Sequence, residues 1–403
     1  MISAQEAWQR LVPHLTPLPE ESVPRREARN RVLSQDIDAT IDVPALDVSA
    51  MDGYALVGPV QPPEVLPVRA TIAAGDPPGT VLAARQAAKI MTGAPIPQGA
   101  DRVLPVERTD GGNDRVKLLE SPPENCHIRR RGEIMRAGDK LLAKGDLLTA
   151  GALSLAATHG YQNLEVFRTP RVSVLVTGDE VVRPEEQPRP GQLRDSHTDF
   201  LLAAGHSLGM DFTSLGLVAD RADSLRQKVQ QGMTDDVLLI TGGVSMGEFD
   251  LVEGVLSELG CNILFEKVAV QPAKPVVAAK HDGGLVFGLP GNPASAMVAF
   301  WLFVRPTLRR LLGYEDSFWH GALRAELEAP LPKSKGRERF LPADIRFDDG
   351  KILVSPLGPK GSHDLAAYGR GTALVRIPAG SAPAPVGAPC EVLPLTDWRS
   401  SAR

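Results

Sequence analysis

Three short glycine-containing stretches each follow an apolar run that is typical of a buried strand. They are Thr177-Gly178-Asp179-Glu180, Thr241-Gly242-Gly243-Val244-Ser245-Met246-Gly247 with Asp250 just beyond, and Gly288-Leu289-Pro290-Gly291-Asn292-Pro293. Because the carboxyl ends of parallel strands meet at one edge of a sheet, we expect all three loops to open there. Glycine lets backbone N–H groups approach an anion such as phosphate, and carboxylates beside them favour a bridging divalent cation. The pattern therefore predicts a site for a phosphorylated ligand with Mg²⁺.

The second of these loops carries a candidate anion cradle formed by Gly242, Gly243 and Ser245. A tight strand-to-helix turn is the alternative interpretation, although a turn alone requires neither the serine nor the acids around it. The loop lacks both the lysine of a P-loop and the glycine spacing of a dinucleotide fold, so neither class is favoured.

Three carboxylates, Glu180, Asp220 and Asp250, are expected at the same sheet edge. Each of them taken singly could cap the helix that follows it. Together they would repel one another and shift each other's pKa unless a cation lay among them. We therefore interpret the trio as candidate ligands of Mg²⁺.

Two lysines and two prolines near these loops are further candidates. Lys267 and Lys274 flank a Gln-Pro-Ala stretch and could contact an anion, although surface lysines are usually solvated. Pro290 and Pro293 fix the backbone of a stiff loop that could form a pocket wall or simply precede a helix.

Several further candidate positions stand in turns or at helix starts. Asp52 and Thr92 lie in glycine-supported turns, and Arg129 begins a run of three arginines that could hold an oxyanion or form a solvated edge. Asp195 is favoured, with the serine after it, as a helix N-cap, and no partner is assigned to His197.

Composition excludes several classes of protein. The 403 residues carry 44 basic and 49 acidic side chains mixed along the chain, which is unlike the basic face of a nucleic-acid binder. Three widely spaced cysteines form neither a disulfide framework nor a zinc-ligand pattern. With no signal-peptide or membrane-spanning pattern, we expect a cytoplasmic protein that does not enter a membrane.

The pattern of apolar residues and the density of proline and glycine change along the chain, and this predicts a multidomain α/β and β protein. An amphipathic helix with a capping box begins at Ser3, a second helix is expected over 25–33, and Thr149 should cap a helix that ends near Gly160. The stretch between the second and third of these helices is rich in proline and glycine, which indicates a β-rich insertion. The expected boundaries are 1–45 plus 132–168 for a discontinuous, elongated helical linker domain, and 46–131 for the insertion.

The second half of the chain first alternates strands and helices and then turns to short strands. Alternation over 169–312 predicts a central, mainly parallel three-layer α/β domain, with helices near 198–204, 221–231, 251–259 and 294–312. Short alternating runs over 313–403 predict a small C-terminal β-barrel or sandwich.

Several ordered motifs resemble one known family. They are Ser49-Ala50-Met51-Asp52-Gly53-Tyr54-Ala55, Ile90-Met91-Thr92-Gly93-Ala94-Pro95-Ile96-Pro97, Arg129-Arg130-Arg131-Gly132-Glu133, the three sheet-edge loops and Gly361-Ser362-His363. Their types and order are similar to those of the molybdopterin molybdenumtransferases, the MoeA and gephyrin E-domain family. The resemblance covers almost the whole chain.

The resemblance implies an elongated homodimer of four-domain protomers with the active site between subunits. It implies Mg²⁺-dependent release of AMP from adenylylated molybdopterin and insertion of molybdate, with a molybdopterin adenylyltransferase as a candidate partner. By motif, the implied catalytic residues are Asp52, Thr92, Glu180 and Asp250, the first two from the partner subunit. The implied metal ligands are Glu180, Asp220 and Asp250, and the implied substrate-binding residues are Arg129, Gly242, Gly243, Ser245, Lys267, Lys274, Pro290, Pro293 and Ser362.

Two positions depart from the family pattern. Ile134 stands where the family usually has an acid, and Gln271 stands where it usually has a lysine. An alternative hypothesis is therefore a paralogue that binds molybdopterin as a scaffold without turnover. Tungstate insertion is a further alternative, because tungstate and molybdate have nearly the same size and charge.

Overall fold

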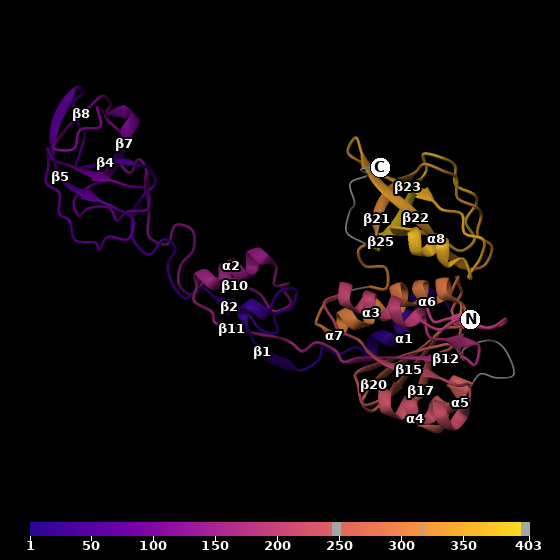
Figure 1. Cartoon of the computed structure of the whole chain (residues 1–403). Helices are drawn as coiled ribbons and strands as arrows, with labels where there is room; N and C mark the ends of the chain where they lie inside the picture. The colour runs from indigo at the N-terminus through magenta and orange to yellow at the C-terminus, as the bar shows by residue number, and fades with distance from the viewer. Residues whose placement is uncertain (244–250, 316, 396–403) are drawn as a thin grey trace. The chain divides into compact units, whose positions relative to one another are not determined.

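The computed structural model describes residues 1–243, 251–315 and 317–395 (Figure 1). The predicted site residues Ser245 and Asp250 lie outside the described residues. The chain forms two compact units. Unit 1 comprises Met1–Ser22, Asn30–Ser34 and Glu165–Arg403, and unit 2 comprises Val23–Arg29 and Gln35–Leu164.

A six-stranded sheet forms the centre of unit 1. Its order is β15 (Thr213–Val218), β12 (Val172–Thr177), β16 (Val237–Thr241), β20 (Gly284–Leu289), β19 (Val277–His281) and β17 (Asn262–Phe265). The first four strands run parallel, and β19 is antiparallel to both of its neighbours, β20 and β17, so β17 runs in the same direction as the first four. The central strands are continuous apolar runs because both faces of a parallel sheet are covered. The expected mainly parallel sheet is confirmed, and the three glycine loops follow adjacent strands at one edge.

Helices cover both faces of this sheet, so the three-layer expectation is confirmed. One face carries α1 (Ala4–Leu11), α3 (His197–Ser207), α6 (Pro293–Ala299) and α7 (Arg305–Leu311), and the other carries α4 (Ala222–Gly232) and α5 (Leu251–Glu258) (Figure 1). A buried π-helical segment, Phe300–Val304, joins α6 to α7. The predicted capping box of α1 is present, since Ser3 Oγ accepts from the Glu6 N–H and the Glu6 carboxylate accepts from the Ser3 N–H.

A closed barrel of five strands ends unit 1, as predicted. Its strands are β22 (Glu338–Asp348), β23 (Lys351–Pro356), β21 (Leu323–Leu327), β25 (Pro389–Pro394) and β24 (Ala373–Ile377), and pairing of β22 with β24 closes it. The helix α8 (Leu365–Arg370) lies beside it. A short strand of the α/β region, β18 (Val270–Gln271), pairs in parallel with β22 and places Gln271 opposite Arg339.

Unit 2 contains a five-stranded sheet, which confirms the β-rich insertion. Its order is β7 (Arg102–Pro105), β4 (Gly53–Leu56), β6 (Ala87–Ile90), β5 (Glu64–Ile72) and β8 (Arg115–Leu118), with an apolar cluster on each face. A small antiparallel pair, β3 (Val48–Ser49) and β9 (Ile128–Arg129), lies beside it.

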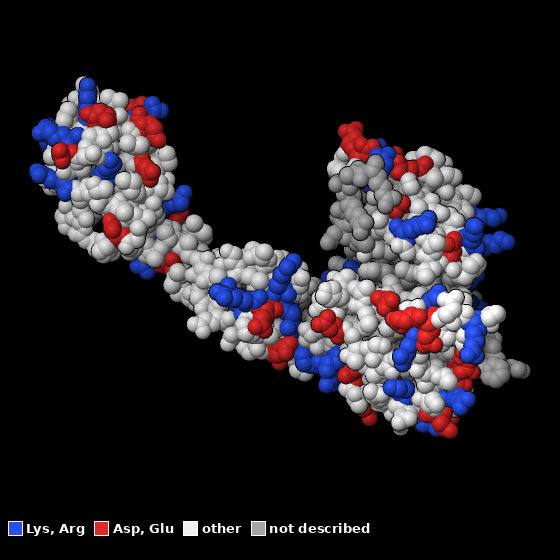
Figure 2. Space-filling view, viewed as in Figure 1, with Lys and Arg blue, Asp and Glu red and all other residues white. Residues whose placement is uncertain are grey.

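Positive and negative side chains are interspersed over the face of the protein shown in Figure 2.

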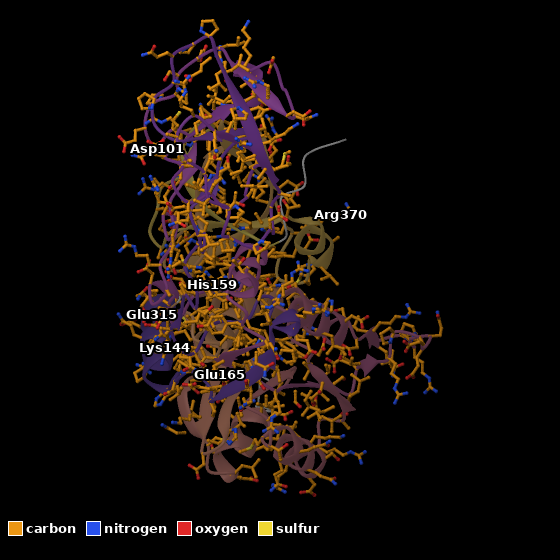
Figure 3. The ribbon with its side chains drawn as sticks, turned by 90° about the vertical axis from the view of Figure 1, so that its left-hand side faces the viewer. Asp101, Lys144, His159, Glu165, Glu315 and Arg370 are labelled. Carbon is orange, nitrogen blue, oxygen red and sulfur yellow. The ribbon has the colours of Figure 1, made fainter. Side chains whose placement is uncertain are left out.

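The rest of unit 2 joins two stretches that are distant in sequence. Thr149 caps α2 (Ala150–Thr158) by accepting from the Ala152 N–H, as predicted. After α2, His159, which Figure 3 labels, accepts at Nδ1 from the Thr40 N–H (3.2 Å), while its carbonyl accepts from Thr40 Oγ1 (2.7 Å). The short strands β2 (Ile37–Asp38) and β10 (Lys140–Leu142) pair beside them.

The helix expected over 25–33 is wrong. Only Arg25–Glu27 forms a single 3-10 turn, and Asn30 adopts a left-handed φ of 62°, which ends any helical path. Leu33 is fully buried and bridges Val166 in extended conformation. Its apolar side chain therefore packs as in a strand and does not form part of a helix face.

The remaining short strands are β1 (Glu20–Pro24), β11 (Asn163–Phe167), β13 (Val181–Val182) and β14 (Leu193–Arg194).

Candidate active site

The sheet edge brings the three glycine loops together through backbone contacts. The Gly242 N–H donates to the Leu289 carbonyl (3.3 Å). A Cβ on Gly242 would lie 2.0 Å from the Thr177 carbonyl oxygen, and its φ of +89° also disfavours other residues. A Cβ on Gly291 would lie 3.7 Å from Gly242 Cα. The loops after β12, β16 and β20 are thus in contact, and Gly242 is required for their close approach.

Carboxylates gather at the ends of β12 and β15. Thr177 Oγ1 donates to Asp220, and the Asp220 N–H donates to Asp179 Oδ1 (3.1 Å). Glu180 is exposed, and its carboxylate folds back over Gly178, where a Cβ would meet Oε2 at 3.0 Å. Glu180 and Asp220 therefore lie at the ends of adjacent strands, as expected. Among the described residues, no group of three or more acidic, histidine or cysteine side chains is poised to hold a metal ion.

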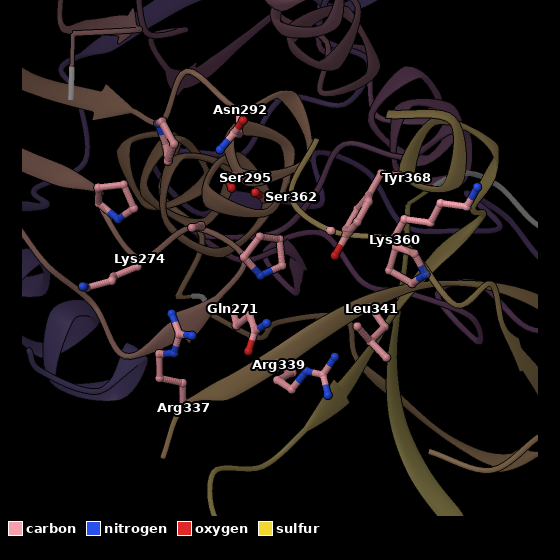
Figure 4. Close-up of a pocket in the computed structure, with 16 residues that line it drawn as sticks. Gln271, Lys274, Asn292, Ser295, Arg337, Arg339, Leu341, Lys360, Ser362 and Tyr368 are labelled. Atoms are coloured by element: carbon pink, nitrogen blue, oxygen red, sulfur yellow. The ribbon is translucent and has the colours of Figure 1, made fainter. Parts of the chain in front are cut away.

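A cavity of about 430 Å³ opens between the loop after β20 and the barrel (Figure 4). Segments of both the α/β region and the barrel line it. The lining residues are Gln271, Pro272, Ala273, Lys274, Pro275, Pro290, Asn292, Ser295, Arg337, Arg339, Leu341, Pro359, Lys360, Gly361, Ser362 and Tyr368. Four of them are cationic, and none of the described lining residues carries a carboxylate. We call this space the cationic cavity, and its charge suits an anionic ligand.

The alternation of β22 explains why cations face this cavity. Successive strand residues point to opposite sides, so Arg339 and Leu341 share the side that lines the cavity, and Arg337, just before the strand, lines it too. Glu338 lies on the other side and accepts from the Arg376 guanidinium. The only acid in this stretch of β22 is therefore paired away from the cavity.

Tyr368 closes the cavity wall from α8. Its hydroxyl donates to the Phe340 carbonyl (2.9 Å). Burial raises the pKa of Tyr368, while the charge of Arg339 acts in the opposite direction. The phenol therefore stays protonated, and its hydrogen bond holds α8 against β22.

A buried histidine supports the loop after β20. His197 Nε2 lies 3.1 Å from the Gly291 carbonyl, which assigns the ring proton to that nitrogen. Burial lowers the pKa of His197, which favours the neutral ring. Asp195 Oδ1 accepts from the N–H groups of His197 (2.8 Å) and Thr198 (3.2 Å), so Asp195 caps α3 as predicted. Ser196 makes no side-chain cap hydrogen bond, so the expectation for it is wrong.

In unit 2, Asp52 and Thr92 form a hydrogen-bonded pair. Asp52 Oδ1 accepts from both the N–H (2.7 Å) and Oγ1 (2.8 Å) of Thr92, and these bonds lower the pKa of Asp52. The backbone of Ser49 bonds to Gly93 and Ala94 beside this pair. Ser49 belongs to β3, which pairs with β9, so Arg129 of β9 lies on the two-stranded sheet that contacts the Thr92 turn.

The other predicted site residues are distributed as follows. Lys274, Pro290 and Ser362 line the cationic cavity, and Pro293 begins α6 just after the Pro290 loop. Gly242 and Gly243 lie at the sheet edge. Lys267 does not line the cationic cavity, since it faces a separate hollow that includes Arg10 and stands 3.8 Å from Glu266.

Of the residues that the barrel region contributes to the cavity, the sequence predicted only Ser362. Arg337 and Arg339 are like residues two positions apart at the start of β22, a strand that the sequence analysis did not predict. Lys360 stands in a Gly-Pro-Lys-Gly turn directly before Ser362, which gave a weaker signal.

No helix in the described part of the chain has both the length and the apolar character needed to cross a membrane.

Three family models match the chain in succession. They are "MoeA N-terminal region (domain I and II)" over residues 2–160, "Probable molybdopterin binding domain" over 173–310, and "MoeA C-terminal region (domain IV)" over 324–395. The cationic cavity combines residues from the second and third of these regions.

Similar proteins span the same length. A molybdopterin molybdenumtransferase of Staphylococcus aureus is 31% identical over 387 residues, covering 94% of this chain and 92% of that protein. Molybdopterin molybdenumtransferase 2 of Mycobacterium tuberculosis is 34% identical, covering 93% of this chain and 95% of that protein. The crystal structure of a molybdopterin biosynthesis MoeA protein from Pyrococcus horikoshii matches with a TM-score of 0.81 and 30% identity, covering 99% of this chain and 100% of that chain. With every region matched in order, this chain belongs to the molybdopterin molybdenumtransferase (MoeA) family, a family of transferases in molybdenum cofactor biosynthesis.

Proposed function

We propose that this chain inserts molybdate into adenylylated molybdopterin in a Mg²⁺-dependent step that releases AMP. The observation that carries this proposal is the cationic cavity, in which four cations and no described carboxylate face a space of about 430 Å³ beside the sheet edge. An adenylylated pterin carries a pyrophosphate, and molybdate is itself an oxyanion, so both substrates bring negative charge to this region.

Positive side chains around the cavity would stabilise the negative charge of the pyrophosphate as it is cleaved. Lys274 from the α/β region and Ser362 from the barrel region both line the cavity (Figure 4), and so does Pro290 from the loop after β20. Fixed charges of this kind lower a barrier when they are aimed at charge that develops in the transition state. At the sheet edge, Gly242 and Gly243 would let backbone N–H groups approach a phosphate closely.

Magnesium fits the residues at the sheet edge. In nucleotide-cleaving sites Mg²⁺ is usually bound by one or two carboxylates together with substrate phosphates, rather than by a complete protein cage. Glu180 and Asp220 at adjacent strand ends supply such carboxylates, so a group of three preformed ligands is not required. We propose these two residues, with Asp250, as the ligands, and Mg²⁺ would supply charge neutralisation of the pyrophosphate.

We further propose a homodimer in which Asp52 and Thr92 act at the site of the partner subunit. The hydrogen bonds from Thr92 keep the Asp52 carboxylate ionised and fixed in orientation, which suits a residue that positions a substrate. Arg129, on the two-stranded sheet of β3 and β9 in the same unit, would supply a cation for the anionic substrate. A molybdopterin adenylyltransferase is the proposed source of the substrate. The proposed location of this chain is the cytoplasm.

The test is release of AMP from adenylylated molybdopterin by the purified chain with Mg²⁺ and molybdate. Asp220→Asn should lower the rate strongly, whereas Asp223→Asn, which removes an exposed charge on α4, should leave it unchanged. Omission of Mg²⁺ should abolish release. Tight binding of the pterin without AMP release would overturn the proposal and support the scaffold alternative. Tungstate in place of molybdate tests the choice of oxyanion.

A further inference from the structure

Three short extended segments of unit 2 run side by side and form a small antiparallel ribbon, which we call the unit 2 ribbon. The middle segment, 47–50, pairs with 127–129 on one side. On its other side it pairs with 93–96, where the N–H groups of Gly93 (2.8 Å) and Ile96 (2.9 Å) donate to carbonyls of the middle segment. Because neighbouring segments are antiparallel, the end of the middle segment lies beside the beginnings of both flanking segments.

Four residues from three separate stretches of the chain lie together at this end of the unit 2 ribbon. Met51 and Asp52 directly follow the middle segment, and Thr92 directly precedes one flanking segment. His127 begins the other flanking segment, and its carbonyl accepts from the Ala50 N–H (2.8 Å). Asp52 and Thr92 are already candidates for the site, whereas His127 is placed beside them only by the pairing of the ribbon.

The side chains at this end have binding capacity that the described residues do not use. Asp52 Oδ1 accepts both hydrogen bonds from Thr92, whereas Oδ2 accepts none within the described part of the chain. The imidazole of His127 likewise has no hydrogen-bond partner among the residues that the structure describes. Met51 is apolar and yet 38% exposed. A carboxylate oxygen, an imidazole and a thioether are therefore available to a ligand at one place.

The charge at this end differs from that of the cationic cavity. The hydrogen bonds from Thr92 lower the pKa of Asp52, so its carboxylate is negative at neutral pH. Asp52 forms no ion pair among the described residues, and Arg129 lies two residues further along its segment, opposite Val48. A negative group without a partner cation repels a phosphate at close range. This end therefore favours a ligand group that donates hydrogen bonds over one that carries negative charge.

We propose that this end of the unit 2 ribbon binds the pterin ring of the substrate. The amino–oxo edge of a pterin carries N–H donors next to a carbonyl acceptor. The Asp52 carboxylate matches the donors, and a ring N–H of His127 matches the carbonyl. The thioether of Met51 provides a polarisable contact for the flat ring. The ligand class is a pteridine with an amino–oxo edge. Its biological meaning rests on the proposed function, whereas pterin binding itself requires no turnover.

The test measures binding of free pterin to the full chain through the fluorescence of the pterin. His127→Gly should weaken binding about fivefold, because one hydrogen bond to the ring is lost. Glycine suits this substitution, since His127 has a left-handed φ of 55°, and a purely backbone role would survive the change. The matched control is Asn30→Gly, which replaces another left-handed residue (φ 62°) and should bind pterin like the parent.

Asp52→Asn provides a second and independent measurement. It keeps an oxygen that accepts from Thr92 but loses the negative charge, so pterin should bind about tenfold more weakly. Inorganic phosphate, tested in parallel, should bind to Asp52→Asn at least as well as to the parent. If His127→Gly fails to fold, as shown by thermal unfolding, Asp52→Asn decides the test.

Pterin binding equal to that of the parent in either folded variant would overturn the inference, as would a parent chain that binds no pterin. The proposed function can fail independently. A parent chain that binds pterin through His127 and Asp52 but releases no AMP would retain this inference and reject the activity. Conversely, normal AMP release with an unchanged KM for the adenylylated pterin in His127→Gly would retain the activity and reject this inference.

Discussion

The sheet edge and the cationic cavity differ in the atoms that form their surfaces. At the sheet edge, neighbouring loops pack backbone against backbone, and Gly242 leaves only 2.0 Å between a Cβ and the Thr177 carbonyl. In the cavity, side chains from β22, from the helices α6 and α8 and from several loops form the wall and reach into open space. The comparison teaches that fold and ligand binding are inseparable at the sheet edge, whereas a cavity side chain can be changed without loss of the fold.

The largest effect on stability should follow from adding a side chain to a glycine at the sheet edge. Gly242→Ala should destabilise the protein by about 2–6 kcal/mol, because backbone strain of about 1–3 kcal/mol adds to overpacking of about 1–3 kcal/mol. The measurement is thermal or denaturant unfolding.

The matched control for that variant is Gly291→Ala. Its Cβ would make an ordinary contact at 3.7 Å, so its stability should stay within about 0.5 kcal/mol of the parent. Equal stability of Gly242→Ala and Gly291→Ala would contradict the backbone-built description of this edge.

Replacing a cation of the cavity should weaken substrate binding and leave the stability of the fold unchanged. Lys274→Gln should raise the KM for the pterin substrate about tenfold, or about 1.4 kcal/mol of binding, because one fixed charge is lost from the wall. Its unfolding temperature should match the parent. Lys267→Gln is the matched control because Lys267 faces a different hollow, and its KM should stay unchanged. An equal rise in both variants would show that the cavity alone does not define the binding surface.

A smaller effect is expected from the hydroxyl on the barrel side of the cavity. Ser362→Ala removes one neutral hydrogen-bonding group, which contributes about 1 kcal/mol to a typical interaction. The KM should therefore rise several-fold with kcat retained. A fall in kcat at constant KM would instead assign Ser362 to the transition state.

The smallest effect concerns the support of the Pro290 loop and depends on pH. Burial lowers the pKa of His197, so the unfolded chain binds more protons than the native one once pH falls below about 6.5. The parent should lose stability over that range, and His197→Gln, which keeps a donor for the Gly291 carbonyl, should lose less. Unfolding temperatures at neutral and mildly acidic pH measure the difference, and parallel pH curves for the two proteins would refute it.

The sheet edge was predictable from sequence because its determinants are local. Buried strands such as Val237–Thr241 read as apolar runs, and the crossover connections require parallel strands whose ends coincide. The turn at Gly242 follows directly. Asp220 was predicted for the same reason, since it follows the strand β15.

The cavity was only partly predictable because its walls come from distant segments. Lys274 and Lys267 looked equivalent in sequence, yet they line different hollows, and the buried residues Val268 and Val270 lie between them in the chain. The contribution of Arg339 depends on the two-residue strand β18, which is too short to produce a pattern. The false helix over 25–33 arose similarly, since one left-handed residue, Asn30, outweighed a helical pattern.

The ladder between β18 and β22 also sets a rule for exchanging parts between related proteins. A chimera that takes a foreign barrel at the boundary after α7 would replace the Arg339 strand but retain the native Gln271 strand. The two sides of the wall would then come from different parents, with their register and charge no longer matched. Any graft of the C-terminal domain should therefore carry Val270–Gln271 along with it.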